Sequence, residues 1–254
     1  MDIKIINLLF SFLLLLIPIT IFIKYKIQLI NTLIKSFSQM IIQLLIIAMI
    51  FQYLFLNKNI FYTIGWLILM LIFSILTLKK RLNIKKSFLW KIIAIALFTN
   101  SIIILPLAIF VFINPKTTFD ARFTIPIYGM ILGNSMNSLA LGIERFNEIL
   151  ADNIKNYYNS ICFGATVHEA SLPILQKSMR ASLLPRIINI SSMGIITLPG
   201  MMTGQILAGA SPFIAIKYQI LIMVLIFSSV TLSSYIGLKL FIYKNFDKFY
   251  LPKT

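Results

Sequence analysis

Residues 198–209 read LPGMMTGQILAG and lie inside an apolar stretch, residues 187–209, that is long enough to cross a membrane. A continuous spanning helix needs neither the Pro-Gly pair nor the two glycines that follow it. Because proline has no N–H, Pro199 in a helix would leave the carbonyl group of Ile195 without its hydrogen-bond partner. The stretch therefore predicts a membrane helix that is interrupted at Pro199.

The interruption also predicts a binding role. Backbone groups freed at membrane depth are tolerated where protein or a water-filled cavity meets them, and broken helices mark binding sites in several transporter folds. Thioether sulfur is a soft ligand, whereas hydroxyl, amide and carbonyl groups supply oxygen ligands. We interpret six residues as part of a substrate path: Pro199, Gly200, Met201, Met202, Thr203 and Gln205. A proline kink filled by methionine packing is the alternative, and no metal ligand is assigned.

The composition places the rest of the chain in the same class. Of 254 residues, 59% are hydrophobic and 12% are charged, whereas about 25% of residues in soluble domains are charged. We predict an all-α polytopic membrane protein whose residues 1–254 form a single permease domain of about seven transmembrane helices. A helical cytoplasmic loop, residues 144–186, is expected between spans five and six. The predicted spans are residues 5–23, 39–56, 60–78, 92–113, 123–143, 187–209 and 218–238. No small-residue cleavage site follows the first span, which we expect to be retained.

Basic residues alternate in number from one predicted connection to the next. One set of connections carries 18 of the 23 Lys and Arg residues, and the other set carries 5. Because cytoplasmic loops retain Lys and Arg, we expect a cell membrane protein, in an inner or plasma membrane, with its N-terminus outside and its C-terminus in the cytoplasm. The net charge of +16 then reflects topology, helped by anionic lipid. No nucleic-acid partner is expected, since no basic face with interleaved aromatic residues is present.

Few residues are available for catalysis or for a metal cluster. Cys162 and His168 are the only residues of their types, which excludes an intrachain disulfide, a cysteine cluster and a zinc site of paired histidines. Asp120, Arg122 and Glu144 lie near predicted span ends, and no ionisable residue lies centrally. An intramembrane enzyme would need paired acids or a nucleophile with its base, so we expect no catalytic residues. A proton-coupled secondary transporter of a small solute, which usually places ionisable residues within its spans, is the alternative function.

The predicted cytoplasmic loop begins with helical periodicity. Apolar residues recur at helical spacing between residues 143 and 161, and Glu144, Glu148 and Asp152 lie four apart on the opposite face. Span five is therefore expected to continue into an amphipathic cytoplasmic helix. The carboxylates on that face either contact solvent or dock a partner.

The next segment, residues 163–173, reads FGATVHEASLP. Gly164 can end the preceding helix in the left-handed conformation, and Thr166 and Glu169 have the spacing of a capping box. Pro173 limits the new helix or begins the next one. We expect a short helix of about two turns, isolated between two breaks, that serves as a contact element. His168 is interpreted as a packing or contact residue within it.

Span five carries a face of small and amide residues within GMILGNSMNSLALG, residues 129–142. Gly129 and Gly133 form a G-x-x-x-G pair, which allows close approach of helices. Asn134 and Asn137 share this face, and an unsatisfied amide is costly in lipid. The two asparagines are predicted either to form hydrogen bonds between helices or to line the substrate path.

Three strings carry a family resemblance: MILGNSMN at 130–137, GATVHEA at 164–170 and LPGMMTGQILAGASPFIAIKYQI at 198–220. They resemble the permease family of the bacterial iron exporter FetB, which also includes plant aluminium-tolerance membrane proteins, over roughly residues 119–234. The resemblance implies the membrane-spanning permease subunit of an ABC transporter that exports a metal ion such as iron. It also implies that GATVHEA is the coupling-helix motif, which contacts the ATP-binding subunit through Gly164, Ala165, Thr166, Glu169 and Ala170.

The rest of the sequence is consistent with a permease chain whose ATP hydrolysis takes place in a separate subunit. The chain has no G-x-x-x-x-G-K-[ST] phosphate loop, so active pumping would need ATP hydrolysis in a partner. We expect no cofactor in this chain and ATP with Mg²⁺ in the ATP-binding subunit. Because seven spans form a small pathway, a homodimer of the permease in the bilayer is also expected.

Overall fold

A computed structural model describes residues 4–57, 59–82, 87–112 and 120–246 of the chain. Within these residues every regular element is a helix, apart from one isolated bridge between Met193 and Thr197. The predicted all-helical class is therefore confirmed. The chain divides into two compact units, Met1–Asn57 and Lys58–Thr254, each described separately below.

The first unit is built from strongly apolar helices whose large side chains are mostly exposed, as expected of segments surrounded by lipid. Lys26 adopts the left-handed conformation, with φ 52°, and ends the helical run before it. The predicted span 5–23 matches this run, whereas span 39–56 is only part of a longer helix. The elements are α1 (Ile5–Ser11), the 3-10 helix η1 (Phe12–Leu15), α2 (Leu16–Lys24) and α3 (Ile30–Asn57).

The second unit contains the predicted functional residues, and its helices begin at recognisable caps. The side chain of Asn59 accepts a hydrogen bond from the Phe61 N–H, and that of Asp120 accepts one from the Arg122 N–H. Pro212 occupies the first turn of the last helix, where its missing N–H costs nothing. The helices are α4 (Ile60–Arg81), α5 (Ser87–Phe112), α6 (Ala121–Asp152), α7 (Ile154–Cys162), α8 (Val167–Ser191), α9 (Gly200–Leu207) and α10 (Pro212–Asn245).

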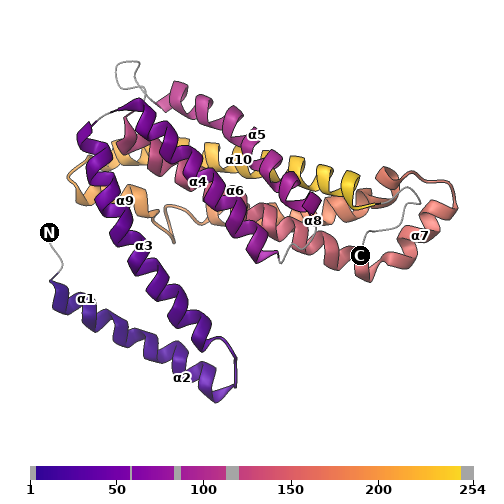
Figure 1. Ribbon diagram of the computed structural model, residues 1–254, viewed down its shortest axis with the longest axis horizontal. Coiled ribbons are helices and arrows are strands. Elements are labelled where there is room, and N and C mark those ends of the chain that lie inside the picture. Colours follow the sequence, from indigo (N-terminus) through magenta and orange to yellow (C-terminus); the bar gives the residue numbers. More distant parts are fainter. Residues whose placement is uncertain (1–3, 58, 83–86, 113–119, 247–254) are drawn as a thin grey trace. The chain divides into compact units, whose positions relative to one another are not determined.

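Helices α6 and α10 form the centre of this unit, and in Figure 1 the yellow α10 runs along α5, α6 and α8. Small residues allow the close approach. A Cβ atom at Gly237 would overlap the side chain of Leu139, and one at Gly142 would lie 3.3 Å from Leu238 Cδ1. Of the predicted G-x-x-x-G pair, Gly129 lies against Met70 of α4, whereas a Cβ atom at Gly133 would have open space around it.

A buried polar cluster joins three of these helices. Asn100 of α5 donates to Ser229 of α10 at 2.7 Å and to Ser135 of α6 at 3.2 Å, and the two serine hydroxyls are 2.6 Å apart. All three residues are fully buried. The Asn100 amide nitrogen and the two hydroxyl groups satisfy one another, whereas Asn100 Oδ1 has no hydrogen-bond partner among the described residues. Burial between helices keeps the polar groups away from lipid.

Five helical stretches in the described residues are long and apolar enough to cross a membrane: Ile6–Lys24, Ile30–Leu56, Ile60–Arg81, Leu89–Phe110 and Pro212–Asn245. The predicted span 123–143 lies within α6, which is more polar than these five stretches and is not among them. Much of α6 is buried against the other helices of the unit. The predicted span 187–209 is not one helix: α8 ends at Ser191 and α9 begins at Gly200. The count of seven spans remains a prediction.

Candidate functional site

A tight corner, residues 163–166, joins α7 to α8. Gly164 has φ 91°, and its N–H donates to the carbonyl group of Ile161 at 2.9 Å. The N–H of Ala165 donates to the carbonyl group of Ser160 at 3.0 Å. This pair of bonds is the Schellman motif, which satisfies the last carbonyl groups of a helix and requires a left-handed residue. The predicted role of Gly164 as a helix end is confirmed.

The capping box that follows is also confirmed. The N–H of Glu169 donates to Thr166 Oγ1 at 3.3 Å, and the N–H of Thr166 donates to Glu169 Oε2 at 2.8 Å. The pKa of the Glu169 carboxyl is lowered, chiefly because this backbone N–H stabilises its charged form, with a further contribution from the Thr166 hydroxyl. The start of α8 is therefore locked by reciprocal hydrogen bonds at neutral pH.

The α8 helix is longer than predicted. The expected isolated helix of about two turns is wrong, because α8 continues through Pro173 to Ser191. Its buried positions explain why: Ala170, Ile174, Ser178 and Ser182 are spaced four apart and form one face of a helix that packs on α6. This packing holds the helix together across the prolines.

The residues predicted to contact an ATP-binding subunit are not equally accessible. Gly164, Thr166 and Glu169 are exposed, Ala165 is half-buried, and Ala170 is 9% exposed because it packs inside the unit. Beside the corner lies a groove of about 400 Å³ between the start of α8 and the end of α10. Its lining includes Thr166, Val167, His168, Tyr235, Lys239 and Tyr243.

The predicted interruption in residues 187–209 is real but larger than a proline kink. Between α8 and α9 the chain forms a turn in which the N–H of Gly194, at φ 91°, donates to the carbonyl group of Thr197 at 2.9 Å. Pro199 is the N-cap of α9. The expectation that Pro199 frees the carbonyl group of Ile195 within a helix is therefore wrong, because Ile195 lies in the turn and is 93% exposed.

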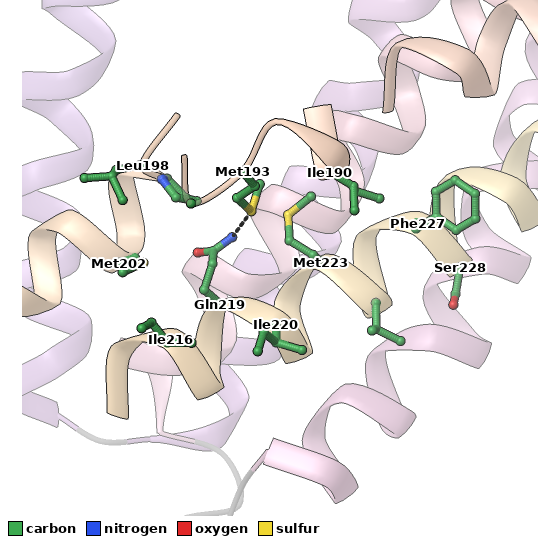
Figure 2. A pocket seen from close by; sticks show the side chains of 13 residues that line it. Ile190, Met193, Leu198, Met202, Ile216, Gln219, Ile220, Met223, Phe227 and Ser228 are labelled. Carbon is green, nitrogen blue, oxygen red and sulfur yellow. Dashed lines mark hydrogen bonds between the residues drawn. The ribbon is translucent and has the colours of Figure 1, made fainter. Parts of the chain in front are cut away.

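A cavity of about 590 Å³, here called the thioether pocket, lies between this turn and α10 (Figure 2). Of the eight residues predicted to form a substrate path, Pro199 and Met202 line it. Met201 packs on the hydrophobic core, and the Thr203 hydroxyl donates to the Pro199 carbonyl group at 3.0 Å. Gly200 begins α9, and Gln205 keeps a buried Oε1 without a hydrogen-bond partner among the described residues.

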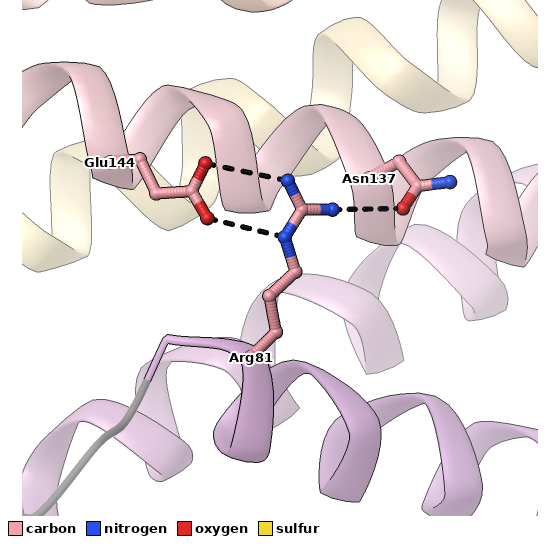
Figure 3. A network of polar contacts seen from close by, with 3 residues as sticks. All are labelled: Arg81, Asn137 and Glu144. Carbon is pink, nitrogen blue, oxygen red and sulfur yellow. Dashed lines mark hydrogen bonds and ion pairs between the residues drawn. The ribbon is translucent and has the colours of Figure 1, made fainter. Parts of the chain in front are cut away.

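The remaining two predicted path residues, on α6, lie outside this pocket. Asn134 donates to the carbonyl group of Met130 in its own helix at 2.6 Å. Asn137 accepts a hydrogen bond from Arg81 of α4 at 3.2 Å, and the same guanidinium group forms an ion pair with Glu144 at 3.2 Å. Figure 3 shows Arg81 reaching from α4 to both residues of α6. Asn137 and Glu144 thus connect helices, whereas Glu148 pairs within α6 with Arg145.

The family model described as Uncharacterised protein family (UPF0014) matches residues 5–246. The chain belongs to the UPF0014 family. It is 34% identical over 194 residues to the UPF0014 membrane protein slr1647 of Synechocystis, covering 76% of this chain and 75% of that protein. It is 30% identical over 228 residues to the probable iron export permease protein FetB of Escherichia coli, covering 89% of this chain and 85% of that protein. It is 28% identical over 204 residues to the protein ALUMINUM SENSITIVE 3 of Arabidopsis thaliana, covering 79% of this chain and 72% of that protein. No solved structure matches the chain.

Three residues of this UPF0014 chain that line or support the described sites do not stand out in the sequence. Arg81 belongs to a run of basic residues at the end of a predicted span. Met193 and Met223 lie in apolar sequence on either side of the LPGMMTG string and meet at one pocket only in the folded chain. Gln219 carried a usable signal, since it is an amide within a predicted span.

Proposed function

We propose that this chain is the membrane-spanning permease subunit of an ABC transporter that exports a metal ion such as iron, powered by a separate ATP-binding subunit. Its membership of the UPF0014 family and its identity to a relative named as an iron export permease support this proposal. The apolar helices support a multi-pass membrane protein. ATP and Mg²⁺ would be bound by the partner, and two copies of this chain would form the pathway.

The corner between α7 and α8 is the structural feature that supports the proposed contact with an ATP-binding subunit. It is held on one side by a Schellman motif and on the other by a capping box, so little conformational entropy remains to be lost on docking. Glu169 and His168 are exposed beside an open groove that contains Tyr235 and Lys239. A rigid, exposed corner with a groove suits the transmission of movement from a soluble subunit to α8.

Co-purification tests this assignment. The tagged chain is expressed in its native host, and the proteins that accompany it through gentle detergent extraction are identified and assayed for ATP hydrolysis. We expect an ATP-binding subunit with the parent chain and its loss with Glu169→Lys, which reverses a charge at the corner. Glu169→Gln retains the capping geometry, because glutamine also serves in a capping box. It should keep the helix start intact.

A matched charge reversal controls for general electrostatic effects. Lys217 is exposed near the start of α10, whereas the corner lies beside the end of that helix, so Lys217→Glu should retain the partner. Retention of the ATP-binding subunit by Glu169→Lys, together with unchanged metal export into inverted vesicles, would overturn the proposed contact.

A further inference from the structure

The groove beside the corner between α7 and α8 has a lining that is divided between apolar and polar residues. It lies between the start of α8 and the end of α10, has a volume of about 400 Å³, and is here called the corner groove. Ile242 and Phe246 line it and are each 6% exposed, so they form its base together with the half-buried Leu175. Exposed polar residues, among them Tyr235 and Lys239, form its edge. The corner groove therefore offers an apolar base and a polar edge to one ligand.

Lys239 gives this edge a positive charge, and no ion pair joins it to a carboxylate among the described residues. Its ammonium group donates a hydrogen bond to the Tyr235 hydroxyl at 3.3 Å and lies 5.5 Å from the centre of the same ring. The described residues that line the groove include no Asp or Glu. The carboxylate of Glu169, at the start of α8, is held by the N–H and hydroxyl groups of Thr166 instead. The corner groove therefore suits an anionic ligand.

The position of Lys239 along α10 matches the surface of a membrane. The predicted span 218–238 ends directly before it, and Tyr235 and Tyr243 lie one helical turn on either side of it. Tyrosine rings gather at membrane–water interfaces, and lysine side chains near helix ends extend their charge to the same level. In the predicted orientation the corner groove opens among the headgroups of the cytoplasmic leaflet, where anionic lipids give the membrane its negative surface potential.

We propose that the corner groove binds an anionic phospholipid of the cytoplasmic leaflet. The phosphate group accepts hydrogen bonds from Lys239, Tyr235 and Tyr243, and an acyl chain covers the apolar base. Tyr235 can donate to the phosphate because Lys239 uses its oxygen and not its hydrogen. Basic pockets between membrane helices bind lipid headgroups in this way. The site goes beyond the proposed transport function, since a lipid here contacts both α8 and α10 and stabilises the corner that the ATP-binding subunit is proposed to contact.

Lipid binding to the purified full-length chain provides the test. The chain in detergent is titrated with phosphatidylglycerol or with phosphatidylcholine that has the same acyl chains, and bound lipid is counted by native mass spectrometry. We expect the anionic lipid to bind about 5-fold more tightly, which is the effect of one basic residue at an anionic surface. Excess inorganic phosphate, which has no acyl chain to cover the base, should not displace it.

Variants at the edge of the groove locate the bound lipid. Lys239→Gln removes the charge and should weaken phosphatidylglycerol binding by about 5-fold, whereas Lys239→Arg keeps the charge and should bind as the parent does. Tyr243→Phe removes one hydroxyl group from a 76% exposed ring and should weaken binding by about 2-fold without affecting the fold. Lys217→Gln, which removes an exposed charge near the start of α10 and outside the groove, is the matched control and should bind as the parent does.

Equal affinities for the two lipids would overturn the site, as would phosphatidylglycerol binding that Lys239→Gln and Tyr243→Phe both leave unchanged. Displacement by inorganic phosphate would also overturn it, because the groove would then be an anion site that needs no lipid. Thermal unfolding of each variant shows whether a loss of binding comes with a loss of fold.

Co-purification of the ATP-binding subunit separates this proposal from the proposed function. Loss of that subunit with Lys239→Gln, at unchanged lipid binding, would make the groove a protein-docking surface and reject the lipid site. Selective lipid binding by a chain that retains no ATP-binding subunit would reject only the ABC assignment.

Discussion

Glu169 shows how one side chain can stabilise a helix and still present charge to a partner. Its carboxylate accepts hydrogen bonds from the N–H and hydroxyl groups of Thr166, yet the residue is exposed. The folded pKa of Glu169 lies below its ordinary value of 4.5. The stabilisation is therefore fully present above that value and is lost as the pH falls through the lowered folded pKa. The corner should be intact across the physiological range.

The cap at α8 can be tested by removing its hydroxyl group. Thr166→Ala should destabilise the start of α8 by about 1 kcal/mol, because the N–H of Glu169 loses its acceptor. Hydrogen exchange of the backbone amides of residues 167–170 measures the effect, which we expect as faster exchange at this helix start than in the parent. Thr166→Ser, which retains the hydroxyl group, is the control and should exchange as the parent does. Equal exchange in Thr166→Ala and the parent would contradict the importance of the cap.

Among the helices, α6 and α10 depend on each other most closely. Phe146 of α6 packs edge-on against Phe241 of α10, with ring centroids 5.5 Å apart. Near them Gly237 leaves room for the fully buried Leu139. Since Leu139 is enclosed on all sides, it cannot move aside easily when its space is reduced.

The same substitution at two glycines should therefore have different effects on stability. Gly237→Ala places a Cβ atom on Leu139 and should lower the free energy of unfolding by about 1–3 kcal/mol through overpacking. Gly65→Ala, on an exposed position of α4 with open space around it, should be neutral or raise it by up to about 1 kcal/mol through helix propensity. Thermal unfolding in detergent measures both. A Gly237→Ala variant as stable as Gly65→Ala would refute the close contact.

Within the second unit, several predicted cytoplasmic features gather at one end. Arg81, at the end of α4, pairs with Glu144 of α6, and the start of α8 lies beside the last turns of α10. These segments carry many of the Lys and Arg residues assigned to the cytoplasm from the sequence. Their meeting at one end is compatible with the proposed orientation, although the bilayer sides of the two termini remain a prediction.

Reporter fusions can test that orientation and the number of crossings together. An odd number of crossings places the termini on opposite sides, so we expect an active cytoplasmic reporter at Thr254 and an active external reporter at Met1. A third reporter, inserted after Gly209 between α9 and α10, should be external if the interrupted segment completes the sixth crossing. Termini on one side would reject seven spans, and a cytoplasmic reporter after Gly209 would show that the interrupted segment turns back.

Local patterns were sufficient for the helical class, the membrane character and the two ends of the α7–α8 corner. These features depend on long runs of apolar residues, on a left-handed glycine and on a capping box, all of which involve neighbours in the sequence. Prediction was less successful for α8, because Pro173 suggests a break locally while packing of Ala170 and Ile174 on α6 favours continuity. The pairing of Arg81 with Glu144 and the meeting of Met193 with Gln219 join residues far apart in the chain. No local pattern encodes them, since the free energy that places these side chains comes from the packing of separate helices.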